Sequence, residues 1–177
     1  SFPKLKTKII KIKYSIDSKK YNSKIRKKNL ITFMSRKLPQ HSTQVLFFLK
    51  KHLPNNWNIK DLNNIDEKEV YKNLCLSKIF LAFSNLEGLP LPPVEAAIAG
   101  NYVIGYTGEG GKDYWKKPIF TEIYSGDIRN FVKQVIKKVA EINSSNKLKQ
   151  KQYRSLANNF SKENEIHHIK KFLNYIS

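Results

Sequence analysis

The sequence is poor in cysteine, in acidic side chains and in long apolar runs. Cys75 is the single cysteine, which excludes an intrachain disulfide and a zinc site built from several cysteines and is compatible with a reducing cytoplasm. No apolar run approaches the ~20 residues that span a bilayer, and the first residues lack the apolar core of a signal peptide. We expect a soluble, cytoplasmic chain of one-domain size that starts without Met and is cut from a longer protein.

The shortage of acidic residues leaves a large positive charge. The chain has 33 basic and 14 acidic residues, and therefore a net charge of +19. Such a charge suggests nucleic acid or anionic lipid as a partner. Lysine outnumbers arginine 29 to 4, however, and asparagine and isoleucine are abundant, as in an AT-rich genome, whereas nucleic-acid sites favour arginine. We favour general lysine richness and keep open a functional basic surface over residues 1–37 and the tail. Residues 87–126 carry three basic and five acidic side chains, so simple attraction of phosphate does not explain this segment.

Short apolar runs alternate with amphipathic stretches along the chain. Runs at 29–34, 57–59, 79–83 and 102–104 predict strands. Helices are predicted from a Ser42 cap to about 53, from an Asp66 cap to about 75, over 93–99, from about 127, and once or twice more up to 175. This alternation predicts an α/β fold, a Rossmann-like parallel sheet flanked by helices.

Two loops that follow predicted strands hold the candidate functional residues. Arg36 and Lys37 follow the first strand, and Glu87 follows the strand that ends at Phe83. Seven residues separate Glu87 from Glu95, which lies in the opening turn of the next predicted helix. We therefore expect both carboxylates to face one crevice. Taken singly, each glutamate is more often a solvated or dipole-stabilising residue. All seven glycines fall between Gly88 and Gly126, which marks this segment as special.

The string from residue 83 to 105, FSNLEGLPLPPVEAAIAGNYVIG, resembles the donor-binding signature of GT-B glycosyltransferases of the family-4 type, also described as glycosyl transferases group 1. The two glutamates (the E-x7-E spacing), the first glycine, the Leu-Pro pair, the Glu-Ala pair and the Val-Ile strand fall in register. The stretch 14–17 resembles the lead into the carboxy-terminal domain of such enzymes, and 107–114 resembles their glycine-rich turn. The resemblance covers about 14–135 and implies the carboxy-terminal half of a GT-B fold.

The resemblance also implies roles for particular residues. Glu87 is expected to accept hydrogen bonds from hydroxyls of the donor sugar, and Glu95 to hold the ribose, because carboxylates accept from diols. Backbone N–H groups of Gly88, Leu89 and Leu91 are expected to cradle the diphosphate, with Gly110 and Gly111 in the glycine-rich turn completing the donor site. Arg36 and Lys37 are expected to stabilise the departing nucleoside diphosphate.

We therefore expect a retaining hexosyltransferase domain that moves a sugar from a nucleoside diphosphate sugar to a glycan or lipid-linked acceptor. We further expect a role in surface polysaccharide synthesis and peripheral contact with the inner face of the membrane. We expect no metal, no cofactor and no nucleic acid partner. The expected parts are a basic lead-in from a missing N-terminal domain (1–28), a nucleotide-sugar-binding domain (29–145) and a C-terminal helical tail (146–177). Pro90 stands where the family has a second glycine. The alternatives are a basic module that binds anionic lipid or nucleic acid, and a catalytically degenerate GT-B domain.

Overall fold

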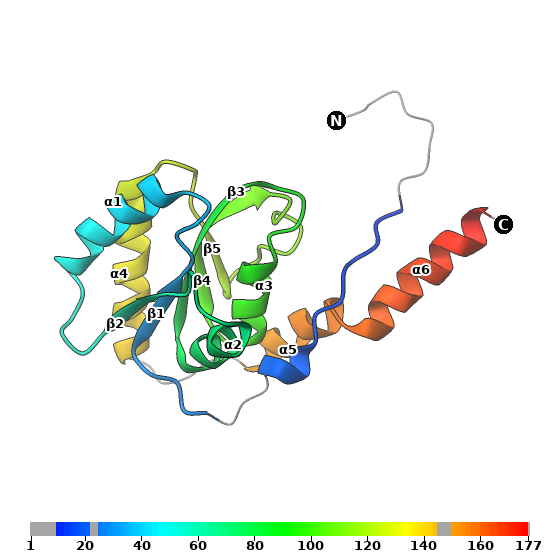
Figure 1. Ribbon diagram of the computed structural model, residues 1–177, viewed down its shortest axis with the longest axis horizontal. Helices are drawn as coiled ribbons and strands as arrows, with labels where there is room; N and C mark the ends of the chain where they lie inside the picture. Colours follow the sequence, from blue (N-terminus) through cyan, green and yellow to red (C-terminus); the bar gives the residue numbers. More distant parts are fainter. Residues whose placement is uncertain (1–9, 22–24, 145–149, 177) are drawn as a thin grey trace.

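The computed structural model describes residues 10–21, 25–144 and 150–176, and a five-stranded parallel sheet forms its centre (Figure 1). Parts of the expected lead-in and tail, at 1–9, 22–24, 145–149 and 177, lie outside the described residues. The strands are β1 (Leu30–Phe33), β2 (Asn58–Asp61), β3 (Ile79–Glu87), β4 (Tyr102–Glu109) and β5 (Phe120–Glu122), in the order β2-β1-β3-β4-β5. All four neighbouring pairs are parallel. The predicted Rossmann-like parallel sheet flanked by helices is confirmed.

Helices cover both faces of this sheet, and they divide the core into two halves. On one face pack α1 (Pro39–Lys50) and α4 (Ile128–Ser144), and on the other α2 (Glu67–Leu76), α3 (Leu91–Ile98) and α5 (Gln150–Asn159) (Figure 1). The central strand β3 serves both halves, since Phe80 and Ala82 belong to the α2/α3 side and Leu81 and Phe83 to the α1/α4 side. The continuous apolar run 79–83 is therefore that of a strand buried on both sides.

A buried polar network closes the amino end of the sheet. Asn101 is fully buried, and its amide donates to the carbonyls of Leu74 and Ala96, each at 2.8 Å. Its oxygen accepts from the Ser77 hydroxyl at 2.6 Å, and Ser77 in turn accepts from Thr32 at 3.1 Å. These bonds join the carboxyl ends of α2 and α3 to the sheet.

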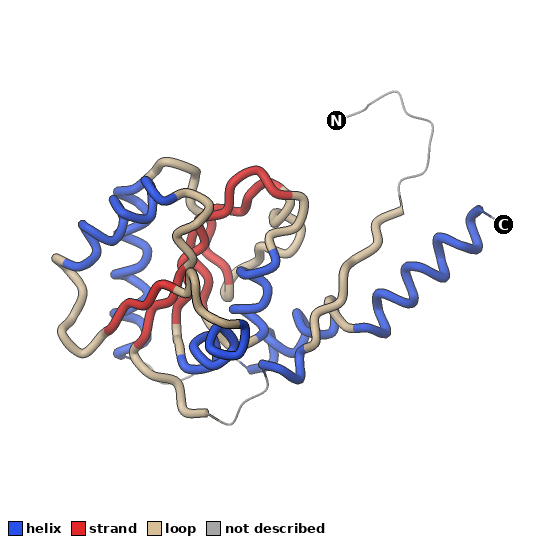
Figure 2. Tube along the Cα trace, viewed as in Figure 1, coloured by secondary structure: helices blue, strands red, loops and turns tan. Residues whose placement is uncertain are grey.

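The carboxyl terminus lies apart from the sheet. Helix α6 (Lys162–Ile176) contains no buried residue, and the segment that leads into the short 3-10 helix η1 (Ser18–Tyr21) runs beside it (Figure 2). The Ser15 hydroxyl donates to Glu165 at 2.7 Å, and the Ile16 N–H donates to the Phe160 carbonyl at 2.8 Å. Within the described residues, no helix combines the length and the apolarity needed to cross a bilayer.

Several predicted boundaries are corrected by the structure. Ser42 does not cap α1, which begins three residues earlier at Pro39, because proline suits the first helical turn and Ser42 donates instead to the Pro39 carbonyl. The predicted cap Asp66 is confirmed, since its carboxylate accepts the Glu69 N–H at 2.8 Å. Strands β3 and β4 both run farther than predicted, and β5 was missed because it is only three residues long.

Candidate functional site

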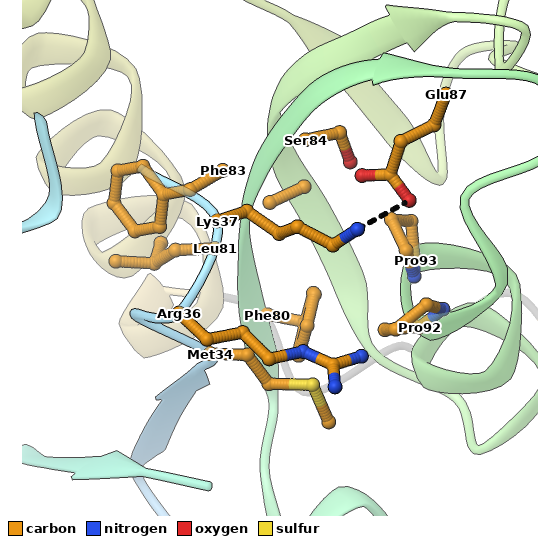
Figure 3. Close-up of a pocket in the computed structure, with 11 residues that line it drawn as sticks. Met34, Arg36, Lys37, Phe80, Leu81, Phe83, Ser84, Glu87, Pro92 and Pro93 are labelled. Atoms are coloured by element: carbon orange, nitrogen blue, oxygen red, sulfur yellow. Dashed lines mark ion pairs between the residues drawn. The ribbon is translucent and has the colours of Figure 1, made fainter. Parts of the chain in front are cut away.

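The order of the strands opens a crevice between β1 and β3. These strands are neighbours, but α1 after β1 packs on one face of the sheet and α3 after β3 packs on the other, so the two loops diverge. In parallel sheets ligands bind at such a switch point, beyond the carboxyl ends of the strands. A pocket occupies this place, with Met34, Arg36 and Lys37 on the β1 side and Ser84, Glu87, Pro92 and Pro93 on the β3 side (Figure 3).

The charged side chains of the pocket come from both loops. Lys37 Nζ lies 3.6 Å from Glu87 Oε2, and 46% of the Lys37 side chain is exposed against 19% for Glu87. The Arg36 side chain extends beside Met34 toward Pro92, and it forms no ion pair with any residue that the structure describes (Figure 3). The pocket thus presents one lysine, one largely covered carboxylate paired with it, and one guanidinium with no ion-pair partner in the described residues.

The loop between β3 and α3 leaves several hydrogen-bond donors unused. The backbone N–H groups of Gly88, Leu89 and Leu91 donate to no acceptor within the described residues. Pro90, Pro92 and Pro93 have no N–H, so these three groups are the loop's donors up to the first turn of α3. Free N–H groups beside a helix N-terminus are suited to binding an anion.

Gly88 and the two glycines of the β4 turn differ in what surrounds them. A Cβ on Gly88 would meet no atom within 4 Å, and the residue does not adopt a left-handed φ. A Cβ on Gly110 would lie 1.9 Å from the Gly88 carbonyl oxygen, and one on Gly111 would lie 2.4 Å from that of Thr107. The fold therefore needs Gly110 for the close approach of two loops and Gly111 for the tight turn after β4, whereas nothing within the described chain requires glycine at 88.

Glu95 is not among the residues that line the pocket. It is the fifth residue of α3 rather than part of its opening turn, because the helix begins two residues earlier than predicted, at Leu91. The Tyr21 hydroxyl from η1 lies beside its carboxylate, with Glu67 and Lys20 nearby. Burial raises the pKa of Glu95, and the Tyr21 hydrogen bond opposes this rise only in part. The structure thus brings Glu87 together with Arg36 and Lys37 and does not place Glu95 among the residues lining that pocket.

Two tyrosines near the site were not among the predicted site residues. Tyr21 contacts Glu95, and the buried hydroxyl of Tyr114 donates to the Pro90 carbonyl at 2.8 Å. Tyr114 lies within the family-like stretch 107–114, whereas Tyr21 lies in none of the family-like motifs. Both contacts join segments that are far apart in the chain, so no spacing rule identifies them.

These features define a Rossmann-like α/β domain with a cationic pocket at its switch point, bordered by a loop whose N–H donors are unused. A scan against models of protein families finds no match, and neither does a search of the curated proteins. Among solved structures the chain is similar to the pneumococcal O-GlcNAc transferase GtfA, crystallised in complex with UDP and GlcNAc, with a TM-score of 0.63 and 16% sequence identity. The likeness covers 93% of this chain and 38% of that one, so the chain spans well under half of GtfA. It shows that the fold is one found in a glycosyltransferase.

Proposed function

We propose that this chain is the donor-binding domain of a glycosyltransferase and binds a nucleoside diphosphate sugar at the β1/β3 pocket. The observation that carries the proposal is the unused donor set, the N–H groups of Gly88, Leu89 and Leu91. They belong to the same loop and helix start whose Glu87, Pro92 and Pro93 line the pocket together with the unpaired Arg36. A diphosphate supplies the acceptors and the negative charge that these groups lack. The similarity to GtfA, a structure holding UDP and GlcNAc, supports this choice of ligand.

The chemistry follows from the placement of the charges. As the bond between the anomeric carbon and the diphosphate breaks, negative charge builds on the leaving nucleoside diphosphate. Arg36, Lys37 and the loop N–H groups stabilise that charge without a metal ion. Glu87 accepts hydrogen bonds from the sugar hydroxyls, and because Lys37 lies 3.6 Å from it, the lysine is within reach of both sugar and phosphate.

The open surroundings of Gly88 support a close approach of the ligand to the backbone. The methyl group that any other residue would add there points into space that the described chain leaves empty. For Glu95, the cost of a partly buried charge supports a binding role, since perturbed carboxylates cluster at functional sites. We propose that it binds the ribose hydroxyls, with Tyr21 as a neighbour that steadies the carboxylate.

The remaining parts of the proposal rest on the sequence resemblance. They are retention at the anomeric carbon, a glycan or lipid-linked acceptor, surface polysaccharide synthesis, a cytoplasmic site beside the membrane, and an N-terminal domain that completes the enzyme. The share of GtfA that the chain leaves uncovered is compatible with such a second domain.

The proposal is tested by thermal unfolding of the purified chain with UDP, GDP, TDP and ADP at constant ionic strength. A ligand at 100 times its Kd stabilises a fold by about 2.7 kcal/mol. We expect one nucleoside diphosphate to raise the melting temperature and Arg36→Met to abolish the rise.

Arg154→Met is the matched control, because Arg154 is an exposed arginine on α5 and its loss changes the net charge equally. Inorganic pyrophosphate provides the second control. If pyrophosphate and every nucleotide act equally, and both arginine variants respond alike, general charge is the cause and the alternative of a basic binding module replaces the proposal.

A further inference from the structure

The loop between β3 and α3 is held from behind by the turn that follows β4. We propose that the Tyr114 hydroxyl is a positioning group for the donor site: by binding the Pro90 carbonyl, it turns the Leu91 N–H outward for an anion. This inference rests on the proposed function for its ligand, but its geometry belongs to the free protein.

Tyr114 is itself firmly held. Only 8% of it is exposed, and its ring packs against Phe120 and Phe160 with centroid separations of 5.5 and 5.7 Å. Burial, together with the Glu87 carboxylate, raises the pKa of Tyr114, so its hydroxyl stays protonated and remains a donor. A rigid ring thus delivers one hydroxyl to one carbonyl, at 2.8 Å.

The start of α3 differs in its backbone bonding from the starts of α1, α2, α4 and α6. The carbonyls of Leu38, Asp66, Asp127 and Ser161, each directly before a helix, accept the N–H four residues onward at 3.0 to 3.1 Å. Pro90 holds the same position before α3, and within the described residues its carbonyl accepts the Tyr114 hydroxyl rather than the Val94 N–H. The Tyr114 hydroxyl is thus the donor that the Pro90 carbonyl has within the described residues.

Peptide planarity converts this bond into an orientation. The Pro90 carbonyl and the Leu91 N–H belong to one trans peptide unit, so they point in opposite directions. The Glu87 carbonyl and the Gly88 N–H form a second such unit, whose carbonyl accepts the Gly110 N–H at 3.1 Å. Two carbonyls of the loop are therefore held by the β4 turn, and the two N–H groups paired with them are directed away from it.

The test compares Tyr114→Phe with Tyr153→Phe. Tyr153 is also a buried tyrosine of the α2/α3 side of the core, but its hydroxyl meets no hydrogen-bond partner in the described chain. UDP and inorganic pyrophosphate titrations, melting temperatures and ¹⁵N-detected exchange of the Leu91 amide are measured for both variants and the wild type. We expect Tyr114→Phe to weaken binding roughly tenfold, as for the loss of one charge-assisted bond, and to change Leu91 exchange in the free protein.

Unchanged affinity and unchanged Leu91 exchange in Tyr114→Phe would overturn the inference, as would an equal loss in Tyr153→Phe. A drop in melting temperature with no change at Leu91 would also overturn it, because it would reveal a purely structural hydroxyl. If the wild type binds no nucleoside diphosphate and no pyrophosphate, the proposed function fails. The amide exchange of the free protein still decides the orientation of the loop in that case.

Discussion

Replacement of Gly88 by alanine is expected to affect fold and binding in opposite directions. Since the new methyl group meets no atom within 4 Å and the backbone is not left-handed, the folded state accepts it without strain. The substitution also removes conformational freedom from the unfolded chain, which stabilises proteins by about 0.4–1 kcal/mol. For a chain of this length the melting temperature should rise by roughly 1–4 °C.

Binding should fall in the same variant. A methyl group on Gly88 occupies the space through which a phosphate would reach the loop N–H groups, and each charge-assisted hydrogen bond lost costs about 1.5–3 kcal/mol. The Kd for the stabilising nucleoside diphosphate should therefore increase roughly 10- to 100-fold. Urea unfolding and isothermal titration measure the two effects on one protein preparation.

Gly110→Ala provides the contrast, because its methyl group would lie 1.9 Å from the Gly88 carbonyl oxygen and must displace the loop. That variant should lose both stability and binding. The reasoning is refuted if Gly88→Ala melts below the wild type, or if it binds the nucleotide with unchanged affinity.

Three further substitutions test the electrostatics and the buried polar network. Glu95→Gln should raise the free energy of unfolding at neutral pH, because the raised pKa of Glu95 means that its charge disfavours folding; the gain should fade as the pH falls through that pKa in urea titrations. The same variant should weaken nucleotide binding, and tighter binding would contradict the proposed ribose contact. Asn101→Leu should cost about 3 kcal/mol in urea unfolding, because three buried hydrogen bonds are lost; a cost below about 1 kcal/mol would contradict this account. Burial lowers the pKa of Lys27 from its ordinary value of 10.5 to about 8. Between these two pH values the unfolded chain therefore binds a proton at Lys27 that the folded chain lacks. Wild-type stability should thus rise over this interval relative to Lys27→Met, and parallel pH profiles would disprove the assignment.

The sequence was most informative where local chemistry decides the structure. Asp66 caps α2 because its carboxylate lies three residues before an N–H that has no other partner, which is a property of the local sequence. The run 79–83 is buried on both sides because a central parallel strand has no solvent face. Arg36, Lys37 and Glu87 come together because neighbouring parallel strands end at one edge, so strand prediction alone placed them.

Prediction failed where two local signals competed or where contacts distant in the chain decide the structure. Ser42 had the chemistry of a cap, but Pro39 could begin the helix earlier. Glu95 was expected to share a crevice with Glu87, but α3 begins two residues earlier than predicted, and Glu95 lies beside Tyr21 without lining the pocket. The role of Tyr114 depends on a contact across 24 residues, and neither its hydrogen bond nor its ring packing leaves a periodic signal in the sequence.

The pairing of residues 13–16 with the region from Phe160 to His168 sets an order of events during synthesis. The hydrogen bonds from Ser15 to Glu165 and from Lys13 to His168 join residues 150 and 155 positions apart. At about 5–20 residues per second, a ribosome makes the second partner roughly 8–30 s after the first. For all of that time the early segment must wait without its partners, while the strands between them have already been made and can pair. The two ends of this unit are therefore among the last parts of the chain to find their native contacts.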